Sequence, residues 1–337
     1  MKLGWTADRA IRILSPAARA AFAANPLRFL REDLHFQVKA VENLSQQRND
    51  GGFCDGVSFI DDGVILYAPT PNSRRENFTL AHELAHWLVT QETTVFDWIA
   101  NQAEPEVILE TVCDRIAAQL LLPNEIVNSI IMNGPVRAQS VVDLFGASNA
   151  SWPACAIALA QHLPGLGAIV LIDRYASMVS HASVNPDPNE GWPLIFPWRN
   201  QPVADWHPLM KLEPGATLSR RISWRTPWDK SHDYFANAVA DDRRIIAVFS
   251  DVDVWSEERQ HIETPREFDK RPLGKIYCCG QERWVRGYPC PTCHEQFCPQ
   301  CKGCRCTRAS KRAAQCSNCF MELQPQLLED GLCELCR

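Results

Sequence analysis

The segment FTLAHELAHWLV, residues 78–89, constrains the fold more than any other part of the 337-residue chain. Residues four positions apart project from the same face of an α-helix, so His82 and His86 would lie side by side. Two imidazoles placed in this way can bind one Zn²⁺. Glu83 lies one step round the helix, where it can take a proton from a water that the metal has made acidic. This H-E-x-x-H pattern predicts a hydrolytic zinc site.

The other residues of this segment form an apolar helix face. They are Leu80, Ala81, Leu84, Ala85 and Leu88. Burial of that face leaves the histidine edge free to line a cleft. The alternative is a structural helix whose two histidines are hydrogen-bonded to neighbours. We favour the metal site because the histidines and the glutamate have the spacing that the chemistry requires.

A zinc hydrolase also needs a third protein ligand and an open fourth position. Residues 105–123, PEVILETVCDRIAAQLLLP, have the pattern of a second helix. Its Glu110 and Asp114 are four residues apart, so both carboxylates share one face. This is similar to the gluzincins, in which a glutamate binds the metal and an aspartate orients a metal-bound histidine. Glu110 could instead be an ordinary exposed helix charge. Rival ligands without a paired aspartate are Asp97, Glu104 and Glu106.

Two stretches of the sequence are specific enough to indicate a protein family. They are RRENFTLAHELAHWLV (residues 74–89) and LETVCDRIAAQLLLP (residues 109–123). Together they resemble the ImmA/IrrE family of metallopeptidases. That family has an FTLAHELGH-type helix followed by a helix of the form E-x-x-C/A-N/D-x-x-A-A-x-L-L-x-P. Asp114 stands where the family has Asn or Asp. The resemblance covers roughly residues 30–125 and extends more weakly over residues 141–159.

The resemblance implies a zincin-like fold with His82, His86 and Glu110 as zinc ligands and Glu83 as the catalytic base. Family members are associated with cleaving helix-turn-helix repressors at a single site. The resemblance therefore implies a regulatory protease, not a digestive one. It does not cover residues 166–337, so the activating signal and the partner stay open.

We expect an α+β protein with four regions. They are a zincin-like metallopeptidase domain over residues 1–125, a helical segment over 126–165, an α/β or β-rich domain of unknown role over 166–275, and a zinc-ribbon-like, cysteine-rich zinc-binding domain over 276–337.

Local patterns predict the elements of the first region. Helical spacing of Ala, Leu and Phe indicates helices over residues 1–50. Residues 56–69 are typical of a hairpin with an Asp-Asp-Gly turn. Ser73 and Glu76 fit a capping box at the start of the histidine helix. We expect a polar loop before the second helix, which Pro105 should begin and Pro123 should end.

The later elements have weaker signals. Residues 124–163 are typical of short helices interrupted by Gly and Pro, and residues 167–173 and 244–255 of buried strands. The tryptophan-rich residues 191–229 lie between those strands. We favour aromatic anchors that fix irregular loops to a sheet over a ligand cage.

The fifteen cysteines are unevenly distributed, since twelve lie in the last sixty residues, mostly as C-x-x-C pairs. In a reducing compartment this clustering indicates metal sites and not disulfides. Of the earlier three, Cys54 could reach the zinc as a latency switch, but we favour a buried structural thiol.

The last four cysteines have the spacing C-x2-C-x13-C-x2-C of a zinc ribbon, and they are Cys316, Cys319, Cys333 and Cys336. At least one further site should come from Cys290, Cys293, Cys298, Cys301, Cys304 and Cys306. Adding Cys278 and Cys279 would suit three Cys₄ sites, although adjacent cysteines rarely both bind one zinc. Cross-braced pairing stays open, and His294 is a less favoured substitute. We expect one catalytic zinc ion and two or three structural ones.

Charge and hydropathy limit the partners. The net charge of −6 argues against non-specific nucleic-acid binding by the whole molecule. Residues 278–320 carry a local excess of five positive charges, which could contact a protein, contact DNA phosphates or be only a solvated face, and we favour a protein contact. No apolar run is long enough to span a membrane and no secretory signal is evident, so we expect a cytoplasmic protein.

Two functions fit these observations. The leading hypothesis is a zinc-dependent endopeptidase that cleaves a regulatory protein through Glu83-assisted attack of a zinc-bound water. The alternative is a non-catalytic zinc-containing adaptor or transcriptional regulator that binds DNA or protein through its cysteine-rich tail.

Overall fold

The computed structural model describes residues 3–41, 56–60, 62–70, 74–102, 104–132, 134–228, 230–256, 268, 271–279, 281–311, 314–319, 322–323 and 328–336. The chain forms two compact units, Met1–Phe268 and Asp269–Arg337, each of which is described by itself. Among the described residues, no helix combines the length and apolar character needed to cross a bilayer.

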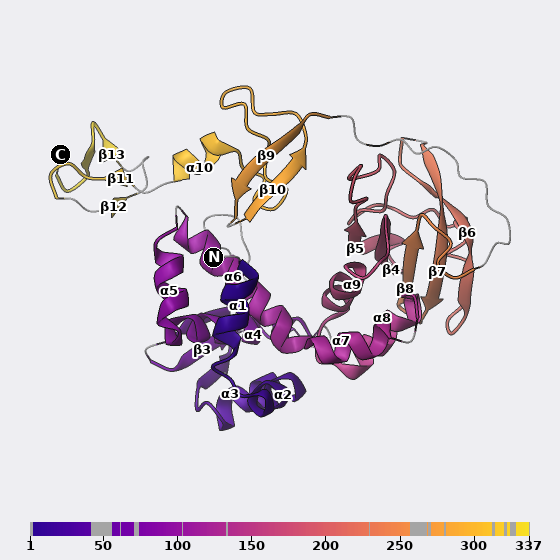
Figure 1. Ribbon diagram of the computed structural model, residues 1–337, viewed down its shortest axis with the longest axis horizontal. Helices are drawn as coiled ribbons and strands as arrows, with labels where there is room; N and C mark the ends of the chain where they lie inside the picture. Colours follow the sequence, from indigo (N-terminus) through magenta and orange to yellow (C-terminus); the bar gives the residue numbers. More distant parts are fainter. Residues whose placement is uncertain are drawn as a thin grey trace. The chain divides into compact units, whose positions relative to one another are not determined.

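The first unit begins with three helices and a small sheet (Figure 1). They are α1 (Leu3–Ile11), α2 (Pro16–Ala24), α3 (Pro26–Glu32), β1 (Gln37–Ala40), β2 (Gly56–Phe59) and β3 (Val64–Tyr67). The strand order is β1-β3-β2, with β1 parallel and β2 antiparallel to β3. The expected hairpin is therefore confirmed, although Asp61 of its turn lies outside the described residues. The expectation of helices over residues 1–50 is wrong at β1, because pairing with β3 holds this segment extended.

Three helices carry the candidate metal centre and its surroundings. They are α4 (Arg75–Gln91), α5 (Thr93–Ala100) and α6 (Pro105–Leu121). α4 and α6 pack against each other, and the predicted apolar face of α4 is at most 1% exposed. α6 begins at Pro105 and ends before Pro123, as predicted. The polar loop expected before α6 is wrong, because α5 buries Val95 and Ile99 there.

The start of α4 differs from the predicted capping box. Ser73 lies outside the described residues, and the N-cap position is held by Arg74 in the left-handed conformation, with φ of 56°. Glu76 instead makes a reciprocal pair with Thr70. The Thr70 amide donates to Glu76 Oε2 over 2.8 Å, and the Glu76 amide donates to Thr70 Oγ1 over 3.0 Å. The partner of Glu76 is therefore Thr70, which lies six positions earlier in the sequence.

The rest of the first unit is a helical connection and a five-stranded antiparallel sheet. Its elements are α7 (Asn124–Ile131), α8 (Ala138–Ala147), α9 (Trp152–Ala160), β4 (Gly167–Asp173), β5 (Met178–Asn185), β6 (Thr217–Arg225), β7 (Ser231–Ala240) and β8 (Arg244–Ser250), with strand order β5-β4-β8-β7-β6. The short helices and the buried strands β4 and β8 agree with the sequence patterns.

Both faces of this sheet are covered. One face continues the core of the preceding helices, and the other packs on a second apolar cluster. Trp224 is buried in that second cluster, which fits the predicted role of an aromatic anchor. Trp192, Trp206 and Trp228 are 41%, 61% and 75% exposed, so the anchor interpretation does not hold for them.

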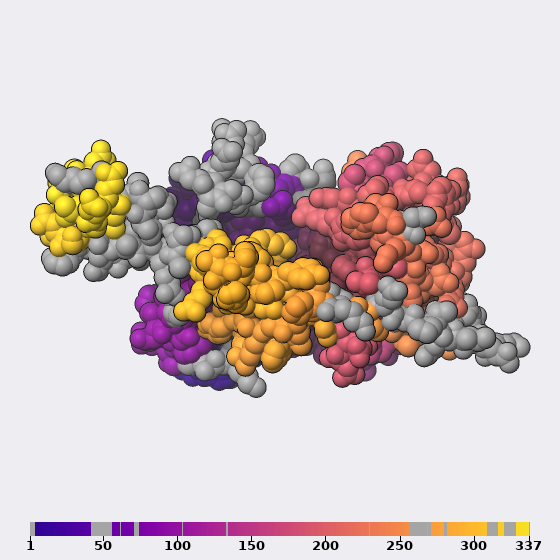
Figure 2. All heavy atoms as spheres, turned by 90° about the horizontal axis from the view of Figure 1, so that it is seen from above, coloured from indigo at the N-terminus to yellow at the C-terminus, as the bar shows by residue number. Residues whose placement is uncertain are grey.

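The second unit is small and rich in cysteine. Its elements are the hairpin β9 (Leu273–Cys278) and β10 (Gln281–Arg286), the helix α10 (Arg305–Lys311), and the short pairs β11 (Ala314–Gln315) with β12 (Glu322–Leu323) and β13 (Leu328–Glu329) with β14 (Leu332–Cys333). Figure 2 shows its atoms in orange to yellow. Three of the four buried residues in its apolar cluster are cysteines. Such a core is too small to stabilise the unit without another source of folding free energy.

Candidate metal centres

α4 and α6 bring three potential metal ligands together. His82 and His86 come from α4, and their Nε2 atoms lie 3.2 Å apart. Glu110 comes from α6, with Oε2 3.3 Å from His82 Nε2 and Oε1 3.6 Å from His86 Nε2. The three ligands predicted from the sequence therefore meet at one point.

These separations fit a bound metal ion. Tetrahedral zinc with bonds of 2.0–2.1 Å places its ligand atoms about 3.3 Å apart. The three separations of 3.2, 3.3 and 3.6 Å are close to that spacing. The Glu110 side chain is 51% exposed, so solvent reaches the cluster from the α6 side. Three protein donors and an open side are the arrangement of a catalytic zinc site.

Asp114 orients the first histidine. Its Oδ1 lies 2.9 Å from His82 Nδ1, which leaves Nε2 directed at the other ligands. Burial lowers the pKa of His82, but hydrogen bonds to Asp114 and Glu110 outweigh it and raise the pKa to about 10. Burial and the nearby charge of His82 lower the pKa of His86. The carboxylates of Asp114 and Glu110 thus favour a positive charge beside them. A metal cation bound by the two histidines and Glu110 would provide such a charge.

Glu83 lies beside the cluster on α4. It is 6% exposed, although it is a glutamate. A Cβ added to Gly56 would lie 2.8 Å from Glu83 Oε1 and 2.4 Å from Thr79 Cγ2. The backbone of β2 therefore lies directly against the Glu83 carboxylate and limits where it can move. Sequence reasoning missed Gly56, because nothing in the local pattern links it to α4.

The rival ligands lie elsewhere. Asp97 is on α5, Glu104 holds the N-cap position of α6, and Glu106 is in the first turn of α6. Among the described residues, the group of potential ligands around the two histidines includes Glu110 and none of these three. Cys54, considered as a latency switch, lies outside the described residues.

Comparison with known proteins agrees with this geometry. Residues 36–149 match the family model of the IrrE N-terminal-like domain, Peptidase_M78. This segment resembles the IrrE N-terminal-like domain. It contains β1 to α8, and with them His82, Glu83, His86, Glu110 and Asp114. The resemblance to the ImmA/IrrE family that the two helices carry is therefore confirmed.

Two curated relatives match part of the chain. The radiation response metalloprotease IrrE of Deinococcus deserti is 24% identical over 147 residues, 42% of this chain and 52% of that protein. The protein of the same name from Deinococcus radiodurans is 25% identical over 150 residues, 44% of each chain. The chain thus spans about half the length of the curated relatives it matches. At this level of identity, the two matches support a metallopeptidase but show neither its substrate nor its mechanism.

One solved structure also aligns with the chain. It is a Mycobacterium tuberculosis transcriptional regulator, with 16% identity over 73% of this chain and 79% of its own and a TM-score of 0.38. A similarity at that level supports no conclusion about fold or function.

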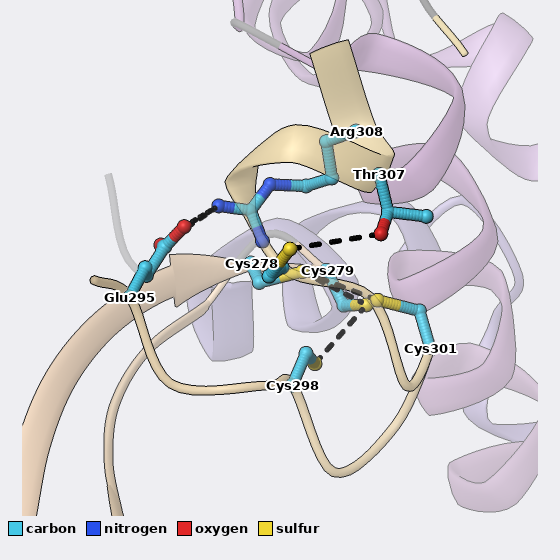
Figure 3. Close-up of polar contacts among 8 residues, drawn as sticks. Cys278, Cys279, Glu295, Cys298, Cys301, Thr307 and Arg308 are labelled. Atoms are coloured by element: carbon cyan, nitrogen blue, oxygen red, sulfur yellow. Dashed lines mark hydrogen bonds and ion pairs between the residues drawn. The ribbon is translucent and has the colours of Figure 1, made fainter. Parts of the chain in front are cut away.

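Beyond the IrrE-like domain, twelve cysteines form three groups of four. The first cluster is Cys278, Cys279, Cys298 and Cys301; the second is Cys290, Cys293, Cys304 and Cys306; the third is Cys316, Cys319, Cys333 and Cys336. The first and second clusters alternate in pairs along the chain, so they are cross-braced. Figure 3 shows Cys298 and Cys301 directed toward Cys278 and Cys279, with Glu295 and Arg308 paired beside them.

The sulfur separations fit tetrahedral metal sites. Zn–S bonds of about 2.3 Å place the sulfur atoms of a Cys₄ site about 3.8 Å apart. In the first cluster, Cys278 Sγ lies 3.7 Å from Cys279 Sγ and 3.4 Å from Cys301 Sγ, and Cys279 Sγ lies 3.8 Å from Cys298 Sγ. All fourteen described cysteines are free thiols, so these sulfurs are not joined as disulfides.

Backbone hydrogen bonds lower the pKa of at least one thiol in each cluster. Burial raises the pKa of Cys298, but the backbone N–H three residues further along and other hydrogen bonds outweigh it and lower the pKa to about 7. The equivalent N–H group lowers the pKa of Cys304 to about 6 and that of Cys316 to about 6. Thiolate is the form that binds metal, so these contacts favour metal binding.

The adjacent pair Cys278–Cys279 was an optional addition to the ligands expected from the sequence. Adjacent cysteines were expected to share a zinc only rarely, but the structure brings both sulfurs into one cluster. The pair lies at the end of β9, where the turn into β10 lets both side chains approach the C-x-x-C segment. His294 belongs to none of the three clusters.

Proposed function

We propose that this chain is a zinc-dependent endopeptidase that cleaves a regulatory protein. The observation that carries this proposal is the meeting of His82, His86 and Glu110 beside a buried Glu83. A structural zinc site would have four protein ligands, whereas this cluster has three among the described residues and an exposed side. The match to the IrrE N-terminal-like domain supports a peptidase at the coarse level.

The residues of the chain have distinct parts in the proposed reaction. Bound zinc would supply Lewis-acid polarisation and lower the pKa of water in the site. Glu83 accepts the proton of the attacking water and passes it to the amine that leaves. Asp114 holds His82 in one orientation through the 2.9 Å contact to Nδ1. The contact with Gly56 keeps the Glu83 carboxylate in place for both proton transfers.

The small sheet supports a peptide as the substrate. β2 is at the edge of the sheet among the described strands and packs against α4. An extended peptide can add to the edge strand of a sheet through backbone hydrogen bonds. A peptide aligned with β2 would run past Gly56 and therefore past Glu83. A scissile bond placed in this way would lie near the metal ligands.

The substrate that we propose is a helix-turn-helix repressor. This rests on the resemblance to the ImmA/IrrE family, whose members are associated with cleaving such proteins. The two curated relatives are named radiation response metalloproteases, which is compatible with a regulatory role. A repressor encoded beside this chain would be the first candidate for a cleavage assay.

The variant Glu83→Gln tests the proposal. It keeps the size of the side chain and removes the base, so bound zinc should be retained while cleavage of a co-expressed repressor falls by at least about a hundredfold. Glu106→Gln is the matched control, because this exposed glutamate is in the first turn of α6. Cleavage by Glu83→Gln at the rate of the parent would refute the enzyme and favour the non-catalytic adaptor.

A further inference from the structure

A cavity of about 620 Å³ lies in the first unit outside the residues of the candidate metal centre. Its walls come from α1, α2, α6, α7 and the connection between α8 and α9. These elements can be located in Figure 1. Its volume is within the range of cavities that hold small organic molecules.

Two arginines give this cavity a cationic wall. Arg12 directly follows α1 and Arg19 lies on α2, and both line the cavity. Asp8 also lines it, and its Oδ1 accepts a hydrogen bond of 2.8 Å from Gln119 Nε2. Glu125, at an exposed position on α7, lines it as well, so the formal charges of the lining balance. A guanidinium group is suited to carboxylate or phosphate, since its planar donors match two oxygens at once.

The polar lining is incomplete among the described residues. Arg19 Nε and Gln119 Oε1 are buried and have no hydrogen-bond partner there. Buried donors and acceptors are nearly always paired, so an unpaired donor and an unpaired acceptor in side chains that line one cavity are notable. Both atoms are closed to solvent, so a ligand in the cavity would contact other polar atoms of these side chains and not these two.

The remaining wall is apolar. It is formed by Ile11, Pro16, Ala20, Leu121 and Ile126 together with further alanines of α2. An inorganic ion would leave this surface in contact with water. An organic molecule with an apolar body would cover it and gain the free energy of its burial.

The cavity wall continues into both helices that carry the metal ligands. Gln119 is on α6, the helix of Glu110. On the other side, Arg74 Nη1 donates to the Ser148 carbonyl over 2.6 Å, and Asn77 Nδ2 donates to the Asn149 carbonyl over 2.9 Å. Ser148 and Asn149 line the cavity, and Asn77 lies in the first turn of α4. The site is thus part of the same packed structure as the candidate metal centre.

We propose that this cavity binds a small organic anion, whose carboxylate or phosphate group contacts Arg12 and Arg19 while its apolar body contacts α2 and α6. Carboxylate and phosphate share the chemistry that the guanidinium groups recognise. The probes for the two are benzoate and phenyl phosphate. Benzyl alcohol, which has the same ring and no charge, is the control ligand.

Calorimetric titration of the full, zinc-loaded chain tests this proposal. At least one anion should bind saturably with one site per chain, and benzyl alcohol at least about tenfold more weakly. Arg19→Gln should weaken binding about tenfold or more, because it removes the charged donor. Ala20→Phe should abolish binding by filling the cavity. Arg28→Gln is the matched control, since Arg28 pairs with Glu32 on α3 and does not line the cavity.

Two further measurements separate this site from the metal centre and from misfolding. Binding should persist in His86→Ala, whereas an anion held by a metal at that centre would be lost. In the parent chain, the bound anion should shift the amide resonances of Ala20, Ala23 and Ala147, which line the cavity. The proposal is overturned if neither anion binds, if both cavity variants bind as the parent does, or if the shifts occur at α4 alone.

Discussion

Asp114 determines which nitrogen of His82 is available to a metal. Its carboxylate is 2.9 Å from Nδ1, so only Nε2 can face the point where His86 and Glu110 meet. A carboxylate in this position also makes the imidazole a stronger ligand. The sequence predicted that Glu110 and Asp114 share one helix face, because they are one helical turn apart and the helical period is a local property, and the structure places both beside His82.

Substitution of Asp114 should therefore weaken metal binding without removing a ligand. We expect Asp114→Ala to lower the zinc affinity of the His82–His86–Glu110 centre by about 10–100-fold. Competition with a chelator measures this affinity, and Glu106→Ala on the same helix is the control. Unchanged affinity in Asp114→Ala would show that the 2.9 Å contact has no part in metal binding.

At the scale of elements, the contact of β2 with α4 is the feature that a single methyl group can disturb. A Cβ at Gly56 would lie 2.4 Å from Thr79 Cγ2 and 2.8 Å from Glu83 Oε1, closer than real contacts allow. Either the strand or the glutamate must move. Because the metal ligands are not in this contact, the disturbance should reach Glu83 and leave the cluster intact.

Gly56→Ala should thus keep its zinc and lose about tenfold or more of its peptidase rate, since small displacements of a catalytic group are costly. Gly146→Ala on α8 is the matched control, because an added Cβ there would contact nothing within 4 Å. Rates and metal content measured side by side check this prediction. Equal rates in the two variants would mean that Gly56 does not position Glu83.

Elements held by distant partners were the ones that sequence patterns did not predict. β1 is a four-residue strand whose conformation depends on its pairing with β3. α5 is polar at its start, and only the burial of Val95 and Ile99 makes it part of the core. Glu76 pairs with Thr70, six positions earlier, a contact that no local sequence pattern indicates. By contrast, α4, α6 and the β2–β3 hairpin are determined by local periodicity, and their prediction was confirmed.

At the scale of the whole molecule, the pairing of the cysteines is a property of topology. C-x-x-C spacing indicates which residues bind metal, but not which pairs share one. The turn between β9 and β10 and the following loops bring the first and second clusters together in alternation. The third cluster has no cysteine between its pairs and can form separately.

This pairing predicts different metal losses for two variants. Cys278→Ala should lose two zinc ions per chain relative to the parent, because the first and second clusters alternate and fold together. Cys336→Ala should lose only one. Metal analysis of the dialysed full chain measures both. A loss of one ion in each variant would contradict a cross-braced pair.

Metal binding also changes the charge of the second unit. Residues 278–320 have seven Lys and Arg against two Glu. Each Zn²⁺ held by four thiolates has a formal charge of −2, so two loaded clusters offset most of this excess. With this excess offset, we predict that the stretch contacts a protein in preference to nucleic-acid phosphates.

The most direct test of the account is to locate the metal in the first unit. A crystal of the full chain, with anomalous differences collected at the zinc absorption edge, would show each bound zinc ion as a peak. We predict a peak about 2.0–2.2 Å from His82 Nε2, His86 Nε2 and a Glu110 oxygen, with Glu83 beside it and not bound to it. Zinc peaks within the cysteine clusters alone, with none between α4 and α6, would contradict the proposed metallopeptidase.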